Sequence, residues 1–215
     1  MLNKIFPKIH DEGYKFLAIA IIVTIFLYFF SSFLGLVGLI LSIWVYYFFR
    51  DPERISINDN NYLTSPADGE VLMVHEVNGP KELGFEDKKF IKISIFMNVF
   101  DCHVNRTPCD GKISEIFYKP GKFLNASLDK ASEDNERNYY KIINNQGEEV
   151  IVVQIAGLVA RRIVCESSKD QQLKQGDRIG MIRFGSRADV YFQNYTPLVK
   201  VGQKTIAGET LLAKK

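Results

Sequence analysis

The fold is decided by the stretch Arg178-Ile-Gly-Met-Ile-Arg-Phe-Gly-Ser-Arg-Ala-Asp-Val-Tyr-Phe192. It contains two short runs rich in Ile, Val, Tyr and Phe, at 178–183 and 190–192, separated by a Gly-Ser dipeptide. Such runs, bounded by glycine and polar residues, predict β-strands, and Gly-Ser is ordinary in a turn between strands. The stretch therefore predicts β-structure on both sides of Gly185 and Ser186.

The same pattern recurs through the chain from Leu63 onward. Short runs of Val, Ile, Phe and Tyr separated by Gly, Pro, Asn and Asp predict further strands. These runs are Gly69–His75, Phe90–Phe96, Gly111–Tyr118, Tyr140–Ile143, Glu149–Ile155 and Thr205–Ala207. Only 123–136 and 158–167 have a composition compatible with helix, and the Asn, Ser and Asp content of the first favours loop. Residues 51–215 are therefore predicted to form one mostly β domain.

Two glycine-containing passages near the C-terminus resemble each other. They are Lys174-Gln-Gly-Asp-Arg-Ile-Gly180 and Lys200-Val-Gly-Gln-Lys-Thr-Ile-Ala-Gly-Glu-Thr210. They resemble the hairpins of lipoyl- and biotinyl-type domains, in which glycine supplies positive φ at tight corners. The predicted fold is thus a barrel-sandwich (lipoyl-like) β domain. Lipoylation itself is not expected, because the sequence has no Asp-Lys-Ala or Met-Lys-Met tip.

The first fifty residues are of a different kind. Between Phe16 and Phe49 more than thirty residues follow one another without a charge. One membrane span needs about 20 residues, so this segment is too long for one untilted span and barely long enough for two. We expect a tight or re-entrant helical hairpin that turns near Ser31 to Gly35. A cleaved signal peptide is disfavoured by the length of the segment, and a buried helix of a soluble protein is the remaining alternative.

Basic residues flank this hairpin on both sides: Lys4, Lys8 and Lys15 precede it, and Arg50 and Arg54 follow it. Because positive charge marks cytoplasmic flanks, both ends of the hairpin are expected on the cytoplasmic side. Trp44, Tyr46 and Tyr47 suit a membrane–water interface. The sequence therefore predicts a membrane-anchoring hairpin at 1–50 and, at 51–215, a domain on the cytoplasmic side of the cell membrane.

Composition argues against several kinds of partner. The net charge of +2 and the lack of a basic stripe with interleaved aromatics argue against nucleic acid. The three cysteines, Cys102, Cys109 and Cys165, are an odd number without Cys-x-x-Cys spacing, and only three histidines accompany them. We therefore expect reduced structural thiols and no metal site.

Two further passages carry residues suited to catalysis. Asp68 lies in Ser65-Pro-Ala-Asp-Gly-Glu70, ahead of a strand, and Asp101 and His103 lie at the end of another run. Each alone also suits an ordinary turn or a structural histidine. With Ser186 they make up a hydroxyl nucleophile, a base and a carboxylate to orient the base. The hydroxyl is placed to attack the preceding carbonyl, because Gly185 has no Cβ to block it.

Residues 45–215 resemble the phosphatidylserine decarboxylases, in the short form with a membrane-anchoring N-terminus. The resemblance rests on Phe48-Phe-Arg-Asp-Pro-Glu-Arg54, Ser65-Pro-Ala-Asp-Gly69, Phe100-Asp-Cys-His-Val-Asn-Arg106, Gln154-Ile-Ala-Gly-Leu-Val-Ala-Arg-Arg-Ile163 and Arg183-Phe-Gly-Ser-Arg187, in that order. It implies a proenzyme that cleaves itself between Gly185 and Ser186. The products are a β chain, 1–185, and an α chain, 186–215, which form a heterodimer, and Ser186 becomes a pyruvoyl group.

The activity implied by the resemblance is the decarboxylation of phosphatidylserine to phosphatidylethanolamine, a step of phospholipid biosynthesis. The pyruvoyl ketone forms a Schiff base with the amine of the serine headgroup, so neither pyridoxal phosphate nor a metal is needed. The implied partners are the membrane and its phospholipid substrate. Homo-oligomerisation and a serine headgroup on ether-linked lipid both remain open.

The resemblance also assigns roles to individual residues. Asp68 belongs to the self-cleavage site, and His103 is the candidate acid that returns a proton to the substrate Cα. The division of roles among Asp68, His103 and Asp101 stays open. In a longer branch of the family a second histidine occupies the position of Arg106, so the role of that histidine must pass here to His103 or to Asp68.

Three arginines are candidates for binding the phosphodiester or the carboxylate of the substrate. They are Arg161, Arg162 and Arg106. Because adjacent residues of a strand point to opposite faces, at most one of Arg161 and Arg162 is expected to act.

Two alternatives belong to other classes. A membrane-anchored adaptor with a barrel-sandwich domain predicts one intact polypeptide with no use for Asp68 or His103. A pyruvoyl decarboxylase of a soluble amino acid shares the break at Gly185–Ser186 but has no use for the apolar hairpin.

Overall fold

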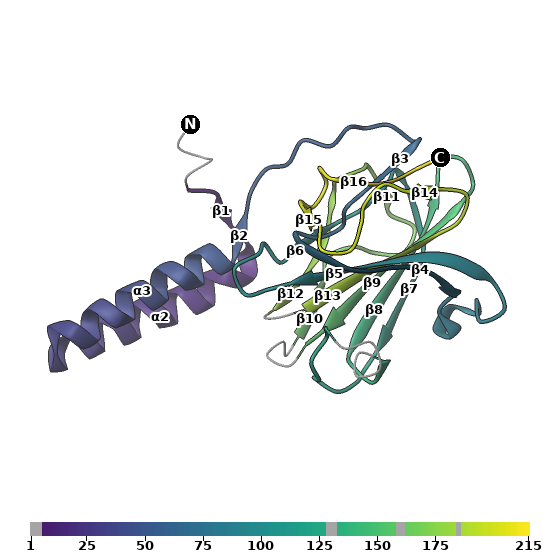
Figure 1. Ribbon diagram of the computed structural model, residues 1–215. Helices are drawn as coiled ribbons and strands as arrows, with labels where there is room; N and C mark the ends of the chain where they lie inside the picture. Colours follow the sequence, from purple (N-terminus) through teal and green to yellow (C-terminus); the bar gives the residue numbers. More distant parts are fainter. Residues whose placement is uncertain (1–5, 128–132, 158–161, 184–185) are drawn as a thin grey trace. The chain divides into compact units, whose positions relative to one another are not determined.

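The computed structural model describes residues 6–127, 133–157, 162–183 and 186–215 (Figure 1). The chain divides into two compact units, Met1–Glu53 and Arg54–Lys215. The first is helical and the second is built from β-strands.

The N-terminal unit is a pair of apolar helices, α2 (Asp11–Phe30) and α3 (Ser32–Phe48), which lie side by side in Figure 1. Ser31 alone connects them: it is extended, its N–H donates to the Leu27 carbonyl, and its hydroxyl accepts from the Phe33 N–H. The residues just before α2 and just after α3 pair as two short antiparallel strands, β1 (Lys8–Ile9) and β2 (Arg50–Asp51). The predicted hairpin with a turn near Ser31 is confirmed.

Small residues let the two helices approach closely. A Cβ added at Gly38 would lie 3.0 Å from Thr24 Cα, and one at Gly35 would lie 2.7 Å from the Tyr28 ring. Thr24 and Ser42 also share a hydrogen bond of 2.9 Å between their hydroxyls. Close backbone approach and hydroxyl pairing of this kind are typical of helices that pack within lipid.

Length and composition make α2 compatible with a membrane span. Among the described residues it is the one helix of at least 18 residues with sufficiently high hydropathy, and α3 is shorter. Only 6% of the apolar 18-residue segment within α2 is buried inside the structure, so the apolar side chains of this segment face outward. This weakly indicates association of the N-terminal unit with a membrane.

The second unit contains an eight-stranded sheet that curls into a half-barrel, in the order β11-β7-β8-β9-β13-β5-β4-β15 (Figure 1). Its strands are β4 (Gly69–Asn78), β5 (Lys89–Met97), β7 (Gly111–Lys119), β8 (Arg137–Asn144), β9 (Glu149–Ala156), β11 (Gln172–Leu173), β13 (Ser186–Phe192) and β15 (Lys204–Thr205). All neighbours in this sheet are antiparallel.

Two three-stranded antiparallel sheets complete the unit. One has the order β10-β12-β6, with β10 (Arg162–Cys165), β12 (Arg178–Arg183) and β6 (Val104–Arg106). The other has the order β14-β16-β3, with β14 (Thr196–Pro197), β16 (Leu211–Lys214) and β3 (Tyr62–Thr64). A short 3-10 helix, η1 (Lys81–Leu83), follows β4.

Strand β13 is buried on both faces. Ala188, Val190 and Phe192 belong to the main core, whereas Tyr191 packs with Tyr139 and other residues in a second cluster. The alternation follows from the two-residue period of a strand. All seven residues of β13 are buried, which makes it the central strand of the sheet.

The prediction of a mostly β fold behind two apolar helices is confirmed. The predicted runs from Gly69 to Arg183 form strands, and the run at 190–192 belongs to a strand that begins earlier, at Ser186. The run Thr205–Ala207 is wrong beyond Thr205, because β15 ends there and the Ala207 N–H donates to the Asp68 carboxylate instead of to a neighbouring strand. The helix considered at 158–167 is wrong for Arg162–Cys165, which pairs as β10 with β12. Tertiary pairing outweighs local propensity in so short a segment. The middle of the segment 123–136 lies outside the described residues.

The two resembling glycine passages form turns that lie against each other. Gly176 and Gly208 have φ values of 87° and 76°, as predicted for tight corners. A Cβ added at Gly208 would lie 3.4 Å from Gly176 Cα and 3.2 Å from Arg106 Cδ. The corners are therefore packed closely around the Arg106 side chain.

Candidate active site

Ser186 is the first residue of β13 and lies between two other strands. It pairs with Met97 at the end of β5 and with Ala156 at the end of β9. The residue is fully buried, and its hydroxyl points at the Met97 sulfur, 3.9 Å away. Because a thioether is a weak acceptor, the hydroxyl is held in place without a strong hydrogen bond.

The segment that carries His103 begins directly after Met97. A turn from Asn98 to Asp101 is closed by the Asp101 N–H, which donates to the Asn98 carbonyl at 3.0 Å. The Asp101 carboxylate accepts from the Asn98 N–H at 2.9 Å and so caps this turn. The turn brings the chain from the Ser186 end of β5 to His103.

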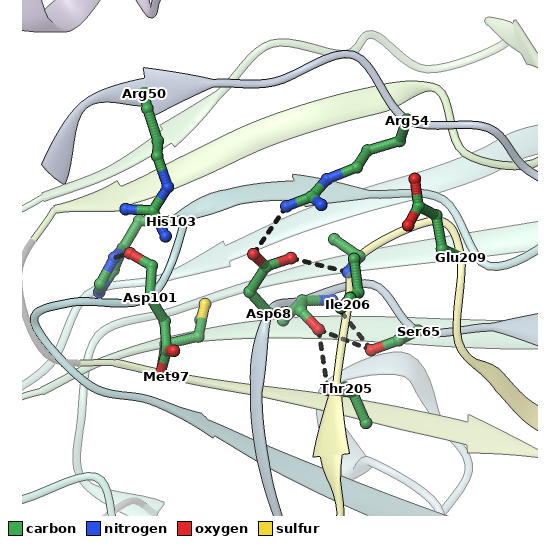
Figure 2. A network of polar contacts seen from close by, with 12 residues as sticks. Arg50, Arg54, Ser65, Asp68, Met97, Asp101, His103, Thr205, Ile206 and Glu209 are labelled. Carbon is green, nitrogen blue, oxygen red and sulfur yellow. Dashed lines mark hydrogen bonds and ion pairs between the residues drawn. The ribbon is translucent and has the colours of Figure 1, made fainter. Parts of the chain in front are cut away.

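The fully buried His103 ring is oriented by the backbone of Asp101. Its Nδ1 lies 3.0 Å from the Asp101 carbonyl oxygen, and Figure 2 shows the two residues side by side. A carbonyl only accepts hydrogen bonds, so this contact places the hydrogen on Nδ1. In the neutral ring Nε2 then carries the lone pair, which is the form that a proton acceptor needs.

Asp68 is held in a compact polar cluster (Figure 2). Its Oδ2 accepts from Arg54 Nη2 at 2.7 Å, and its Oδ1 accepts from the Ala207 N–H at 2.8 Å. The Ser65 and Thr205 hydroxyls both donate to the Ala67 carbonyl, at 2.7 Å and 3.0 Å. The carboxylate is therefore charge-compensated and fixed in direction.

Gly69 brings the Asp68 loop against the end of β5. It has a φ of 155°, and an added Cβ would lie 2.2 Å from the Phe96 carbonyl oxygen. No other residue type fits such an approach without moving one of the two backbones. Asp68 is therefore followed in the chain by Gly69, which packs against Phe96, the residue before Met97 in β5.

The predicted arginines separate into different places. Arg106 is buried and donates from Nη1 to the Gly176 carbonyl at 2.8 Å, so its guanidinium points toward the glycine corners. Arg162 is exposed at the start of β10, opposite Arg183 in the ladder. Arg161 and Gly185 lie outside the described residues.

The ion pairs of Arg54 and Arg187 were not predicted from the sequence. Arg54 was expected to flank the membrane segment but pairs with Asp68, and its place in the motif Phe48–Arg54 was the available signal. Arg187 donates from Nε and Nη2 to the two carboxylate oxygens of Asp189, at 2.6 Å and 2.7 Å, and both side chains are 1% exposed. This pair fixes the backbone directly after Ser186.

The three cysteines are free thiols. Cys102 and Cys109 are buried and Cys165 is exposed. Burial raises the pKa of the Cys109 thiol to about 12, so this thiol is neutral and unreactive near pH 7.

Comparison with known proteins gives a consistent result. A family model described as phosphatidylserine decarboxylase matches residues 41–213. The phosphatidylserine decarboxylase proenzyme of Pelagibacter ubique (strain HTCC1062) is 89% identical over 215 residues, which is 100% of both chains. Those of Ruegeria pomeroyi and Rickettsia typhi are 52% and 49% identical, covering 99% and 98% of this chain and 98% and 92% of their own lengths.

The matched region contains Asp68, His103 and Ser186, whose segments meet where β5 and β13 pair. Since the family model spans most of the chain and the relatives match it almost from end to end, the chain belongs to the phosphatidylserine decarboxylase family.

Proposed function

We propose that this chain is a self-cleaving proenzyme that decarboxylates phosphatidylserine to phosphatidylethanolamine at a membrane. The observation that carries the proposal is the position of Ser186, a buried hydroxyl at the first residue of a central strand. The segments of Asp68 and His103 both lead to the β5 residues beside it. The names of the relatives, all proenzymes of this activity, support the same reaction.

In the proposed cleavage, Ser186 Oγ forms a bond to the Gly185 carbonyl carbon and gives its proton to a base. The bond between that carbon and the Ser186 nitrogen then breaks, the nitrogen takes up a proton, and an ester results. Loss of the Ser186 α-proton expels the Gly185 carboxylate and leaves dehydroalanine. Water hydrolyses this to ammonia and a pyruvoyl group.

Asp68 and His103 are the proposed proton-transfer groups, and Asp68 acts in the cleavage. Its carboxylate keeps a fixed direction through Arg54 and the Ala207 N–H. Arg106 does not take the place of a histidine here, because a guanidinium stays protonated and this one is bonded to the Gly176 carbonyl. His103 is assigned to returning a proton to the substrate Cα.

The site fits a pyruvoyl group at position 186. Backbone pairing with β5 and β9 holds this residue from both sides, and the Arg187–Asp189 pair holds the next residues, so the position survives the loss of the peptide bond before it. The ketone supplies an electron-withdrawing group for the breaking carboxylate bond. Arg162, exposed at the start of β10, is assigned to an anionic group of the substrate.

The helical hairpin gives the enzyme its access to lipid. The apolar α2 and α3 enter the bilayer, and the basic residues around them keep both ends, and the catalytic unit, on the cytoplasmic side. The enzyme then meets a diacyl substrate that stays in the membrane.

The test is the intact mass of the denatured protein, compared with Ser186→Ala. We expect two chains that separate at Gly185–Ser186 in the wild type, one uncleaved chain in Ser186→Ala, and release of CO2 from phosphatidylserine vesicles by the wild type alone. If the cleaved wild-type protein is inactive on these vesicles but active on a soluble amino acid, phosphatidylserine is not its substrate and the assignment changes to that amino acid. A single intact chain with full activity would overturn the mechanism.

A further inference from the structure

A chain of polar side chains crosses the apolar interior of the β unit toward Ser186. It consists of Asn105, Gln154, Asn138 and Tyr140, with exposed fractions of 0%, 0%, 1% and 0%. Tyr140 is part of the main core cluster, whose members are mainly Ile, Val, Ala and Leu. Burying polar groups in such a core carries a desolvation cost that hydrogen bonds only offset, so their placement calls for a functional reason.

The members of this chain bind one another in sequence. Gln154 Nε2 donates to Asn105 Oδ1 at 2.9 Å. Gln154 Oε1 accepts from Asn138 Nδ2 at 3.2 Å, and the Tyr140 hydroxyl lies 3.1 Å from the same oxygen. The Tyr140 hydroxyl donates its one hydrogen to the Ile179 carbonyl at 2.7 Å, because that carbonyl only accepts, and this bond anchors the far end of the chain.

These contacts determine which way the Asn105 amide points. Its Nδ2 faces the Pro66 carbonyl at 3.3 Å, where an oxygen would be repelled. Asn105 Oδ1 therefore turns toward Gln154, and Gln154 must present its own amide nitrogen there. The amide nitrogen of Asn138, which donates to Gln154 Oε1, matches this orientation of Gln154.

The amide nitrogen of Asn105 and the hydroxyl of Ser186 approach the same methionine. Nδ2 lies 3.6 Å from the Met97 sulfur, the same sulfur that the Ser186 hydroxyl approaches to 3.9 Å. Gln154 lies opposite Ala188, on the same face of the sheet as Ser186 and two residue pairs further along. Asn105 thus holds a donor beside Ser186, with a long contact to a carbonyl and a weak one to a thioether.

We propose that Asn105 donates a hydrogen bond to the oxygen that becomes negative when Ser186 attacks the preceding carbonyl, and that Gln154 is the positioning residue that aims it. This inference rests on the proposed self-cleavage. As the Oγ–carbon bond forms, the carbonyl electron pair moves to its oxygen and the hydroxyl proton passes to the base. Asn105 keeps its own proton throughout. A preorganised donor stabilises such an oxyanion far more than it stabilises the neutral carbonyl.

The experiment measures the rate of chain cleavage in freshly synthesised protein, by denaturing electrophoresis and intact mass. Asn105→Ala is expected to slow cleavage about 100-fold or more, as for the loss of one oxyanion donor elsewhere. Asn105→Asp, which keeps the shape but not the donor, is expected to slow it at least as much. Asn144→Ala is the matched control. Asn144, at the end of β8, is buried like Asn105, but its amide hydrogen-bonds Glu148 and Tyr195 instead.

Two Gln154 variants separate aiming from packing. Gln154→Glu presents only oxygens, so the Asn105 amide is expected to flip and turn its oxygen toward Ser186, with a loss as large as that of Asn105→Asp. Gln154→Met removes the bond without enforcing the flip and is expected to lose less. Equal losses for both would indicate packing alone and would overturn the role of Gln154.

Folding is checked separately by thermal unfolding of each variant in the uncleavable Ser186→Ala background. A wild-type chain that cleaves, with Asn105→Ala and Asn105→Asp that cleave equally fast, overturns this inference and leaves the proposed function intact. A wild-type chain that never cleaves overturns the proposed function itself. Slow cleavage in folded Asn105→Asp with normal cleavage in Asn144→Ala supports the donor role.

Discussion

At the scale of single residues, His103 and Asp68 are oriented by different kinds of contact, a backbone carbonyl for His103 and a charged side chain for Asp68. His103 is oriented by the Asp101 carbonyl, and the Asp101 carboxylate closes the preceding turn. Asp68 is oriented by Arg54 and a backbone N–H. The histidine is thus oriented by a neutral backbone group, whereas the aspartate is paired with a permanent cation.

The first prediction concerns His103→Ala. Because His103 is assigned to proton return and Asp68 to cleavage, this variant is expected to cleave but to lose about 100-fold or more in decarboxylation. Intact mass measures the first property, and CO2 release from phosphatidylserine vesicles measures the second. The exposed His75 on β4 provides the control, His75→Ala. Normal turnover in His103→Ala would remove His103 from the acid role.

Residue identities in the site were predictable where a motif carries them. Asp68, His103 and Ser186 follow from short motifs, which identify these residues without identifying their contacts; of the three, only His103 has its cited partner, the Asp101 carbonyl, within a few residues. Arg54 and Asn105 acquire their roles from contacts with segments 14 or more residues away. Local sequence contains no information on which distant carbonyl or carboxylate a side chain will meet.

At the scale of elements, Gly69 determines where the Asp68 loop meets β5. Gly69→Ala is expected to destabilise the protein by about 3 kcal/mol or more, because the methyl group would overlap the Phe96 carbonyl oxygen and φ is positive. Gly202→Ala, at a φ of 85° with open space around it, should cost only about 1–2 kcal/mol. Chemical unfolding in the Ser186→Ala background measures both, and equal losses would contradict the steric argument.

The start of β9 is held by charges that make its stability depend on pH. Burial by itself would raise the pKa of Glu149, but the ammonium groups of Lys88 and Lys141 outweigh it and hold the pKa below the ordinary 4.5. A carboxyl whose pKa is lower in the folded state stabilises the fold above its unfolded pKa. That contribution is lost as the pH falls through the folded pKa.

Glu149→Gln is therefore expected to cost about 0.5–1 kcal/mol at pH 7, and the difference from wild type should shrink as the pH falls below 4.5. Urea unfolding at several pH values measures it. Glu86→Gln, at an exposed residue, is the control. A difference that stays constant down to strongly acidic pH would mean that charge is not its source.

At the scale of the whole molecule, the proposed cleavage would leave two interwoven chains. Residues 186–215 provide β13, β15 and β16, which pair with β5, β9, β4 and β3 from the preceding part of the chain. Because β13 is a buried central strand, its removal would open the core.

We therefore expect the cleaved chains to remain together through purification and to separate only on unfolding. Size-exclusion chromatography in mild detergent should elute both fragments in one peak, and a denaturant should separate them. Ser186→Ala, which stays one chain, gives the reference elution. Loss of the small fragment without denaturant would contradict the central position of β13.

The sequence by itself determined the two kinds of structure in this protein, an apolar helical pair and a β-rich unit, because hydrophobic period and length are local properties of the chain. It also determined the family, since short motifs carry the resemblance, and it predicts the Gly185–Ser186 bond as the site of cleavage. Only the tertiary structure decided that β10 is a strand, that Arg54 pairs with Asp68 and that Asn105 and Ser186 both approach the Met97 sulfur. These features arise from pairing and burial between distant segments, whose energies depend on the assembled fold.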